Sequence, residues 1–218
     1  RTNLDFMAGS MDVHTLVITS TVPEESKSNV AVNLALTLAE SGKKVALVDC
    51  DLRKPVLHRY LKAGHNVKGV SNVLSNQCTL DEALQELKEM NLTFLPAGTP
   101  PPNPSEMLSQ PQMQAMVNTL REKFDVVIFD APPVSVVTDA AVIGRCVDGA
   151  MFVVRSDYAP ADAVRGAVKK LQDAGVRVLG SVLTRYDMKK ALKGSSYAYS
   201  YAYNYNYAYE KQKADVVE

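Results

Sequence analysis

The sequence predicts an α/β fold in which a mostly parallel central sheet is covered by helices on both faces and is followed by a flexible C-terminal tail. Continuously apolar runs alternate with helix-periodic stretches, and polar residues follow directly after several of the runs. Unbroken apolar runs are typical of strands buried on both faces. The predicted strands lie at residues 14–20, 44–50, 92–98, 125–132, 149–155 and 176–184.

Two segments interrupt the simple alternation. The first predicted strand leads into a helix over residues 27–42, as expected, but residues 57–90 are less apolar. Within them Thr79, followed three residues later by Glu82, forms a capping-box pattern that predicts a short helix. We expect this segment to be an insertion over the crevice at the carboxyl ends of the strands.

The second interruption is rich in proline. Residues 99–112 contain five prolines, which predicts an extended loop, with Ser105 as the cap of a following helix. The apolar pattern fades after Thr184. The sequence therefore predicts a folded domain over residues 1–186 and a flexible tail over residues 187–218.

Composition limits the classes of function. The chain has 218 residues, of which 46% are hydrophobic, enough for one sizeable domain. Lysine plus arginine equals aspartate plus glutamate at 24 each, which argues against nucleic acid as a partner. Three separated cysteines predict neither a disulfide framework nor a zinc site and fit a reducing cytosol. No signal pattern or bilayer-spanning apolar run is found.

The segment TSTVPEESKSNVAVNLALTLA, residues 19–39, fits a phosphate-binding loop only in part. The pattern G-x-x-x-x-G-K-[ST] places a lysine and a hydroxyl at the start of a helix, where backbone N–H groups bind a phosphate. Lys27 and Ser28 meet this requirement, but Thr21 and Ser26 stand at the two glycine positions. Alone, the segment fits a nucleotide site and an ordinary helix cap equally well.

Carboxylates at later strand ends favour the nucleotide site. Asp49 and Asp51 end the segment LVDCD, and like charges this close repel each other unless a cation or a transferred proton joins them. Asp130 follows four apolar residues, as the Walker B acid does in proteins that bind Mg²⁺ with a nucleotide. The loop and the three acids, in this order, form a specific pattern that predicts a P-loop NTPase-like fold.

The segments TSTVPEESKS, VDCDLRKP, PAGTPPPNPSEML and FDAPPV, with the tyrosine-rich tail, resemble the cytoplasmic catalytic domain of the bacterial protein-tyrosine kinases (BY-kinases) that govern capsule and exopolysaccharide synthesis and export. The resemblance spans nearly the whole chain. It implies an ATP-dependent tyrosine kinase with Mg²⁺. The loop in that family usually reads P-G-E-G-K, whereas this chain has Pro23, Glu24, Glu25, Ser26 and Lys27.

The resemblance also implies residue roles. Lys27 would contact the β- and γ-phosphates, Asp49 would activate the tyrosine hydroxyl, and Arg53 would stabilise charge that develops on phosphate. The metal would be held through Ser28, Asp51 and Asp130. The residues expected around the nucleotide are Thr21, Glu25, Ser26, Lys27, Ser28, Asn29, Thr184 and Arg185.

The tail holds seven of the chain's ten tyrosines in strict alternation. Ala, Ser and Asn between them offer little to bury, so we expect a flexible segment rather than an edge strand. The resemblance implies that these tyrosines are autophosphorylation sites: Tyr197, Tyr199, Tyr201, Tyr203, Tyr205, Tyr207 and Tyr209.

The partners that the resemblance implies are other copies of the chain, a membrane activator of the chain-length-determinant type, and further protein substrates. Family members form rings through an E-x-x-R-x-x-R segment, of which Arg1 alone stands in this sequence, so we expect weaker ring formation. We expect a cytoplasmic location at the inner face of the membrane, through a membrane partner or a preceding membrane segment.

Two alternatives stay open on the sequence. One is a partitioning or septum-site ATPase of the same deviant P-loop group, whose loop carries an additional lysine where this chain has Val22. The other is a catalytically silent nucleotide-binding or scaffold module, which the missing loop glycines suggest. Retention of Lys27, Ser28 and the three aspartates argues against the silent module.

Overall fold

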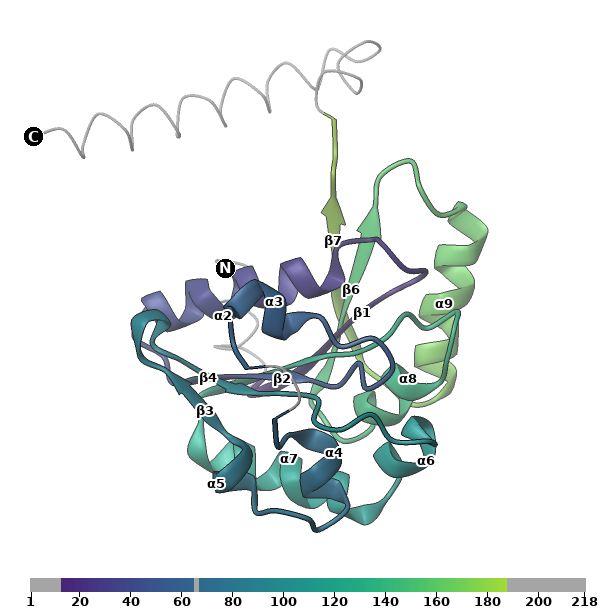
Figure 1. Cartoon of the computed structure of the whole chain (residues 1–218). Coiled ribbons are helices and arrows are strands. Elements are labelled where there is room, and N and C mark those ends of the chain that lie inside the picture. The colour runs from purple at the N-terminus through teal and green to yellow at the C-terminus, as the bar shows by residue number, and fades with distance from the viewer. Residues whose placement is uncertain (1–12, 65–66, 188–218) are drawn as a thin grey trace, which may run out of the picture. The chain divides into compact units, whose positions relative to one another are not determined.

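The computed structural model of the chain describes residues 13–64 and 67–187 (Figure 1). The tail tyrosines and Arg1, for which the sequence made specific predictions, lie outside the described residues. The contacts within the chain divide it after Thr184. In the described part, no helix combines the length and apolar character needed to cross a membrane.

A seven-stranded sheet with the order β3-β4-β2-β5-β1-β6-β7 forms the centre of the fold. All neighbouring strands run parallel except β3 and β4, which are antiparallel. The predicted mostly parallel α/β fold is confirmed. The strands are β1 (Thr15–Ser20), β2 (Val45–Asp49), β3 (Gln85–Leu87), β4 (Leu92–Leu95), β5 (Val126–Asp130), β6 (Gly149–Arg155) and β7 (Val178–Thr184).

Helices cover both faces of the sheet and give two separate hydrophobic cores (Figure 1). Because successive side chains of a strand point to opposite faces, Leu16 and Ile18 of β1 join one core and Val17 joins the other. The first core contains α2 (Lys27–Glu40) and α3 (Leu57–Leu61). The second contains α4 (Val70–Leu74), α5 (Leu80–Ala83), α6 (Pro104–Leu108), α7 (Pro111–Lys123), α8 (Asp139–Gly144) and α9 (Ala161–Asp173).

The proline-rich segment differs from the prediction. Residues 99–112 are not one extended loop, because α6 begins at Pro104 and α7 at Pro111. Proline suits the first turn of a helix, where its missing N–H would have no partner within the helix. Ser105 therefore lies inside α6, and Asn103 occupies the N-cap position that the sequence analysis had given to Ser105.

The segment at residues 57–90 packs on both faces of the sheet, extends its edge, and contributes His58, Gly64 and Val67 to the walls of a hollow beside Asp49. The predicted capping box is confirmed, with Thr79 and Glu82 hydrogen bonded to each other's backbone N–H, but the helix ends at Ala83. Residues Gln85–Leu87 then form β3, which the sequence analysis missed. A strand this short has too few residues to show an alternating pattern.

The carboxyl ends of the central strands bring the predicted polar residues together. Asp49 of β2 and Asp130 of β5 are direct neighbours in the parallel register, and β1 pairs with β5 on its other side. Ser20 ends β1, and the loop that follows it leads to Lys27, the first residue of α2. The sheet therefore aligns the predicted phosphate-binding loop with the two acids.

The loop at residues 21–26 adopts left-handed backbone geometry at two non-glycine residues. Glu24 has φ of 66° and Ser26 has φ of 72°. Ser26 is also the N-cap residue of α2, yet its side chain makes no capping hydrogen bond. A left-handed conformation costs an L-residue roughly 1–2 kcal/mol, so the glycine-free loop is strained at both positions.

Replacing Ser26 by glycine is expected to stabilise the fold. Glycine adopts positive φ without steric cost, and the gain should exceed glycine's entropic penalty, giving a net increase of about 1 kcal/mol in the free energy of unfolding. Ser41, the C-cap of α2 with φ of −81°, provides the matched control, because Ser41→Gly relieves no strain and should destabilise. Urea denaturation of both variants without nucleotide measures the difference, and equal losses would argue against strain at Ser26.

Candidate active site

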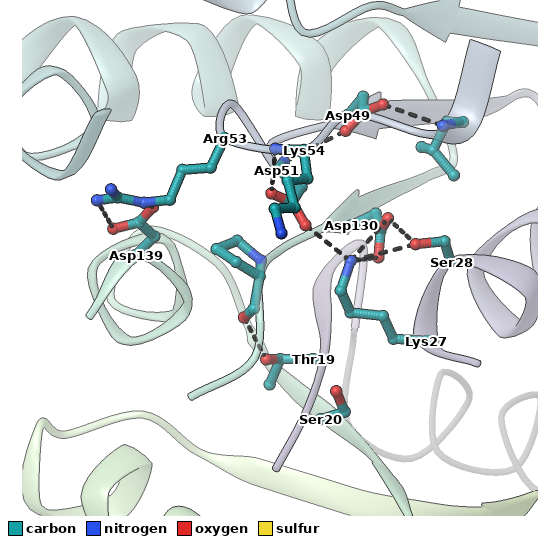
Figure 2. A network of polar contacts seen from close by, with 12 residues as sticks. Thr19, Ser20, Lys27, Ser28, Asp49, Asp51, Arg53, Lys54, Asp130 and Asp139 are labelled. Atoms are coloured by element: carbon teal, nitrogen blue, oxygen red, sulfur yellow. Dashed lines mark hydrogen bonds and ion pairs between the residues drawn. The ribbon is translucent and has the colours of Figure 1, made fainter. Parts of the chain in front are cut away.

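Lys27 lies at the centre of a polar cluster formed by three segments of the chain (Figure 2). Its Nζ atom is 3.1 Å from Asp51 Oδ2 and 3.3 Å from Asp130 Oδ2. The same atom is 3.1 Å from the hydroxyl of Ser28. The structure therefore brings together the lysine, the hydroxyl and two of the three acids that the sequence predicted.

Ser28 and Asp130 form the tightest contact in this cluster. The Ser28 hydroxyl donates a hydrogen bond of 2.5 Å to Asp130 Oδ2. Asp130 is fully buried at the end of β5, and Ser28 is buried in the first turn of α2. A hydroxyl and a carboxylate held side by side are oxygen ligands of the kind that Mg²⁺ prefers.

Asp49 and Asp51 have different partners, although they are close in sequence. Asp51 contacts Lys27 directly and accepts a hydrogen bond of 3.0 Å from the backbone N–H of Lys54. The Asp49 carboxylate instead accepts backbone hydrogen bonds of 3.2 Å from Asp51 and from Leu57. The strand ends at Asp49, so Asp51 lies beyond it and the two side chains do not project from one extended strand.

Burial and crowding of the acids set the charge state of the site. Burial, reinforced by the charge of Asp130, raises the pKa of Asp49 to about 8. Burial also raises the pKa of Asp130, although Lys27 and Ser28 oppose the shift. For Lys27, burial lowers the pKa but Asp130 and Asp51 outweigh it, so the pKa is raised and the lysine stays charged. Near neutral pH, Asp49 therefore holds a proton most of the time.

Cys50 lies between the two acids in sequence and is fully buried. Burial, together with the charges of Asp49 and Asp130, raises the pKa of its thiol well above the usual range. The neutral thiol packs in the core that contains α4 to α9.

The donor set fits Mg²⁺ bound together with a nucleotide. Among the described residues, no three His, Cys, Asp or Glu side chains are arranged to hold a metal by themselves. Mg²⁺ seldom needs such a group, because it keeps several waters and takes other ligands from phosphates. The oxygens of Ser28, Asp51 and Asp130 would then complete its shell. Thr21, in the loop that precedes Lys27, has a buried hydroxyl with no hydrogen-bond partner.

Of the other residues predicted around the nucleotide, some are buried and hold the loop in place, and others are exposed. The carboxylate of Glu25 is buried within the protein, where it accepts hydrogen bonds of 2.8 Å from the N–H of Val22 and 3.2 Å from that of Arg155. Thr184 donates its hydroxyl to the carbonyl of Glu25 at 3.0 Å. These two residues therefore fix the loop. Asn29 and Arg185 are exposed.

Arg53 does not join the Lys27 cluster. Its guanidinium binds Asp139 of α8, with Nε 3.0 Å from Oδ2, and donates to the Ser105 hydroxyl of α6 at 2.8 Å. Ser105 in turn donates to Asp139, which is fully buried. In this structure Arg53 connects the acid-bearing segment to two helices rather than pointing at the Lys27 cluster. The sequence analysis missed Asp139, whose position after Thr138 resembles an ordinary helix start.

Comparisons with known proteins agree with this geometry. A family model described as AAA domain matches residues 25–145. The tyrosine-protein kinase YwqD of Bacillus subtilis is 36% identical over 197 residues, which are 90% of this chain and 81% of YwqD. The putative tyrosine-protein kinase CapB of Staphylococcus aureus is 35% identical over 90% of this chain and 85% of CapB.

Solved structures extend the comparison to the fold. The kinase domain of Escherichia coli tyrosine kinase ETK superposes with a TM-score of 0.81 at 33% identity, covering 84% of this chain and 72% of that one. The septum site-determining protein MinD of Pyrococcus horikoshii, solved with Mg-ADP, has a TM-score of 0.69 at 24% identity over 79% of this chain and 70% of its own, which shows a shared fold alone. Because identity to the kinases exceeds 30% across most of the chain, the chain belongs to the bacterial tyrosine-protein kinase family.

Proposed function

We propose that the chain is an ATP-dependent protein-tyrosine kinase that phosphorylates the C-terminal tyrosine cluster of other copies of itself and regulates capsular or exopolysaccharide synthesis and export. The observation that carries this proposal is Lys27, held by Asp51 and Asp130 at the carboxyl ends of neighbouring strands. Ligands of open α/β sheets bind at this edge. Membership in the tyrosine-kinase family supplies the reaction class.

The residues of the site divide the work of phosphoryl transfer. Bound Mg²⁺, held by Ser28, Asp51 and Asp130, would neutralise charge on the β- and γ-phosphates. Lys27 would exchange its carboxylate partners for phosphate oxygens, and the loop N–H groups would surround the phosphates. Arg53 holds the segment that carries Asp51, so we assign it a positioning role in place of direct contact with phosphate.

Asp49 is our candidate for the group that accepts the proton of the tyrosine hydroxyl. It borders a hollow whose walls include Pro55, His58 and Pro96. With a pKa of about 8, its carboxylate form is a stronger base than an ordinary aspartate at the same pH. Asp49 is 1% exposed, so an acceptor tyrosine would reach this carboxylate only if the hollow widened when substrate binds.

Self-association and a membrane partner belong to the same proposal. The resemblance to the BY-kinases suggests both partners. The solved chimerical protein CapA2B2 is similar to this chain, with a TM-score of 0.80 at 34% identity over 85% of this chain and 81% of its own. We propose that this chain acts at the inner face of the membrane through such a partner, and that it phosphorylates further proteins. The expected weakening of ring formation at Arg1 remains a prediction.

The strained loop favours one second candidate, a module that binds nucleotide without transferring phosphate. Glu24 and Ser26 impose the backbone cost that glycine would avoid. Intact-mass measurement after incubation with Mg·ATP separates the two functions, since each phosphate transferred to tyrosine adds about 80 Da. A silent module would leave the mass unchanged.

Lys27→Met is expected to abolish this mass gain while the protein stays folded. The lysine supplies charge to the phosphates and belongs to neither hydrophobic core. Its loss leaves Asp51 and Asp130 without their cation, so the variant is expected to be less stable than the unaltered chain, and its folding is checked by circular dichroism. Lys169→Met, at an exposed position of α9, is the matched control and should phosphorylate normally. Near wild-type incorporation by Lys27→Met would remove the basis of the proposed site.

Asp49→Asn and Asp51→Asn are expected to fail in different ways. Loss of the base at position 49 should lower kcat by about 10²–10⁴-fold with little change in nucleotide affinity, whereas loss of Asp51 should weaken Mg·nucleotide binding. A base must be deprotonated, so the wild-type rate should rise with pH through about 8, the pKa of Asp49. Steady-state kinetics and calorimetry measure both, and equal losses of affinity would contradict these roles.

Phosphorylation of the tail is expected to occur between chains. At about 3.3 Å per extended residue, the tyrosines could reach roughly 40–80 Å from Thr184, far enough for a neighbour's site. Full-length Lys27→Met is mixed with an active chain that ends at Gly194, and the inactive chain's tail should gain phosphate at a rate that increases with enzyme concentration. No phosphate on the inactive chain's tail in this mixture, together with modification of the unaltered chain at a rate independent of its dilution, would mean transfer within one chain.

A further inference from the structure

Glu24 creates an electrostatic problem for a loop that binds phosphate. The resembling family has glycine at this position, whereas this chain places an exposed carboxylate there, in a left-handed conformation with φ of 66°. A carboxylate and a triphosphate are both anionic, so a freely moving side chain at this position would weaken nucleotide binding.

Glu24 is contacted by Arg155, the last residue of β6, and by Tyr158, three residues further along the chain. The hydroxyl of Tyr158 lies 3.4 Å from Glu24 Oε2, and Arg155 Nη1 donates to the carbonyl of Glu24 at 3.3 Å. The Arg155 guanidinium also lies over the Tyr158 ring, 4.2 Å from its centroid. Arg155 therefore orients the Tyr158 ring and also holds the backbone of Glu24. Tyr158 in turn binds the Glu24 side chain.

The same part of the sheet anchors the next residue of the loop. The buried Glu25 carboxylate accepts from the backbone N–H of Arg155, and the Glu25 carbonyl accepts from the Thr184 hydroxyl at the end of β7. Glu25 is thus tied to the ends of β6 and β7, and Glu24 to the end of β6 and to Tyr158. The direction of the Glu24 side chain is set from outside the loop.

We infer that Tyr158 and Arg155 are positioning residues for Mg·ATP: they hold the Glu24 carboxylate away from the phosphates and so compensate for the missing glycine. This inference rests on nucleotide binding by the loop, which is part of the proposed function. It assigns a role to a tyrosine outside the tail. The contact is partly exposed, so its effect is expected to be a modest change in affinity that depends on the charge of Glu24.

A double-mutant cycle tests the inference on the full chain with Mg·ADP as the probe. Tyr158→Phe keeps the ring beneath Arg155 and removes only the hydroxyl, and it should weaken binding roughly three- to tenfold. Glu24→Gln removes the charge, so adding Tyr158→Phe to it should change affinity less than twofold. Because the released carboxylate acts through solvent, the loss in Tyr158→Phe should shrink between 50 and 500 mM NaCl, as screening increases.

Tyr60→Phe, at an exposed position of α3, is the matched control and should bind like the unaltered chain. An equal loss from Tyr158→Phe in both Glu24 backgrounds would mean that Tyr158 acts on the nucleotide directly, which overturns the inference but leaves the proposed function intact. No loss in either background overturns it as well. Failure of the unaltered chain to bind Mg·ADP would overturn both the inference and the proposed function.

Discussion

The site depends on one constraint: carboxylates that end neighbouring parallel strands cannot all be ionised without a cation between them. The register of β2 and β5 makes Asp49 and Asp130 neighbours, and Asp51 follows within the same turn. In this structure Lys27 supplies the cation to Asp51 and Asp130, while Asp49 is left to hold a proton. The pairing of β2 with β5 therefore places a lysine that is ion-paired with two acids, Lys27, beside a protonated acid, Asp49.

That constraint explains why the loop can lose its glycines and still keep its shape. Lys27 is fixed by its acids at the start of α2, while Glu25 and Thr184 fix the preceding residues against β6 and β7. The loop is held at both ends by contacts that need no glycine. These contacts therefore offset the strain energy of the left-handed backbone at Glu24 and Ser26, as is common where strain is stored at a functional site.

Features set by local pattern or by strand order could be predicted from the sequence, and features set by contacts between distant residues could not. Unbroken apolar runs gave the parallel strands, and the order of Lys27, Asp49, Asp51 and Asp130 gave the core of the site. The contact between Arg53 and Asp139 joins residues that are far apart in the chain, and no local signal indicates it. The tail tyrosines keep their predicted role as a proposal, since they lie outside the described residues.

The burial of Cys50 has a consequence for the chemical reactivity of the site. Thiols react with oxidants and alkylating reagents as thiolates, and burial among carboxylates keeps this one neutral. A reagent that modifies accessible thiols would therefore pass over the cysteine nearest the acids, although it stands between two of them in sequence. Oxidants would therefore not inactivate phosphoryl transfer by modifying Cys50. Covalent inhibitors that react with thiols would not react with this cysteine either.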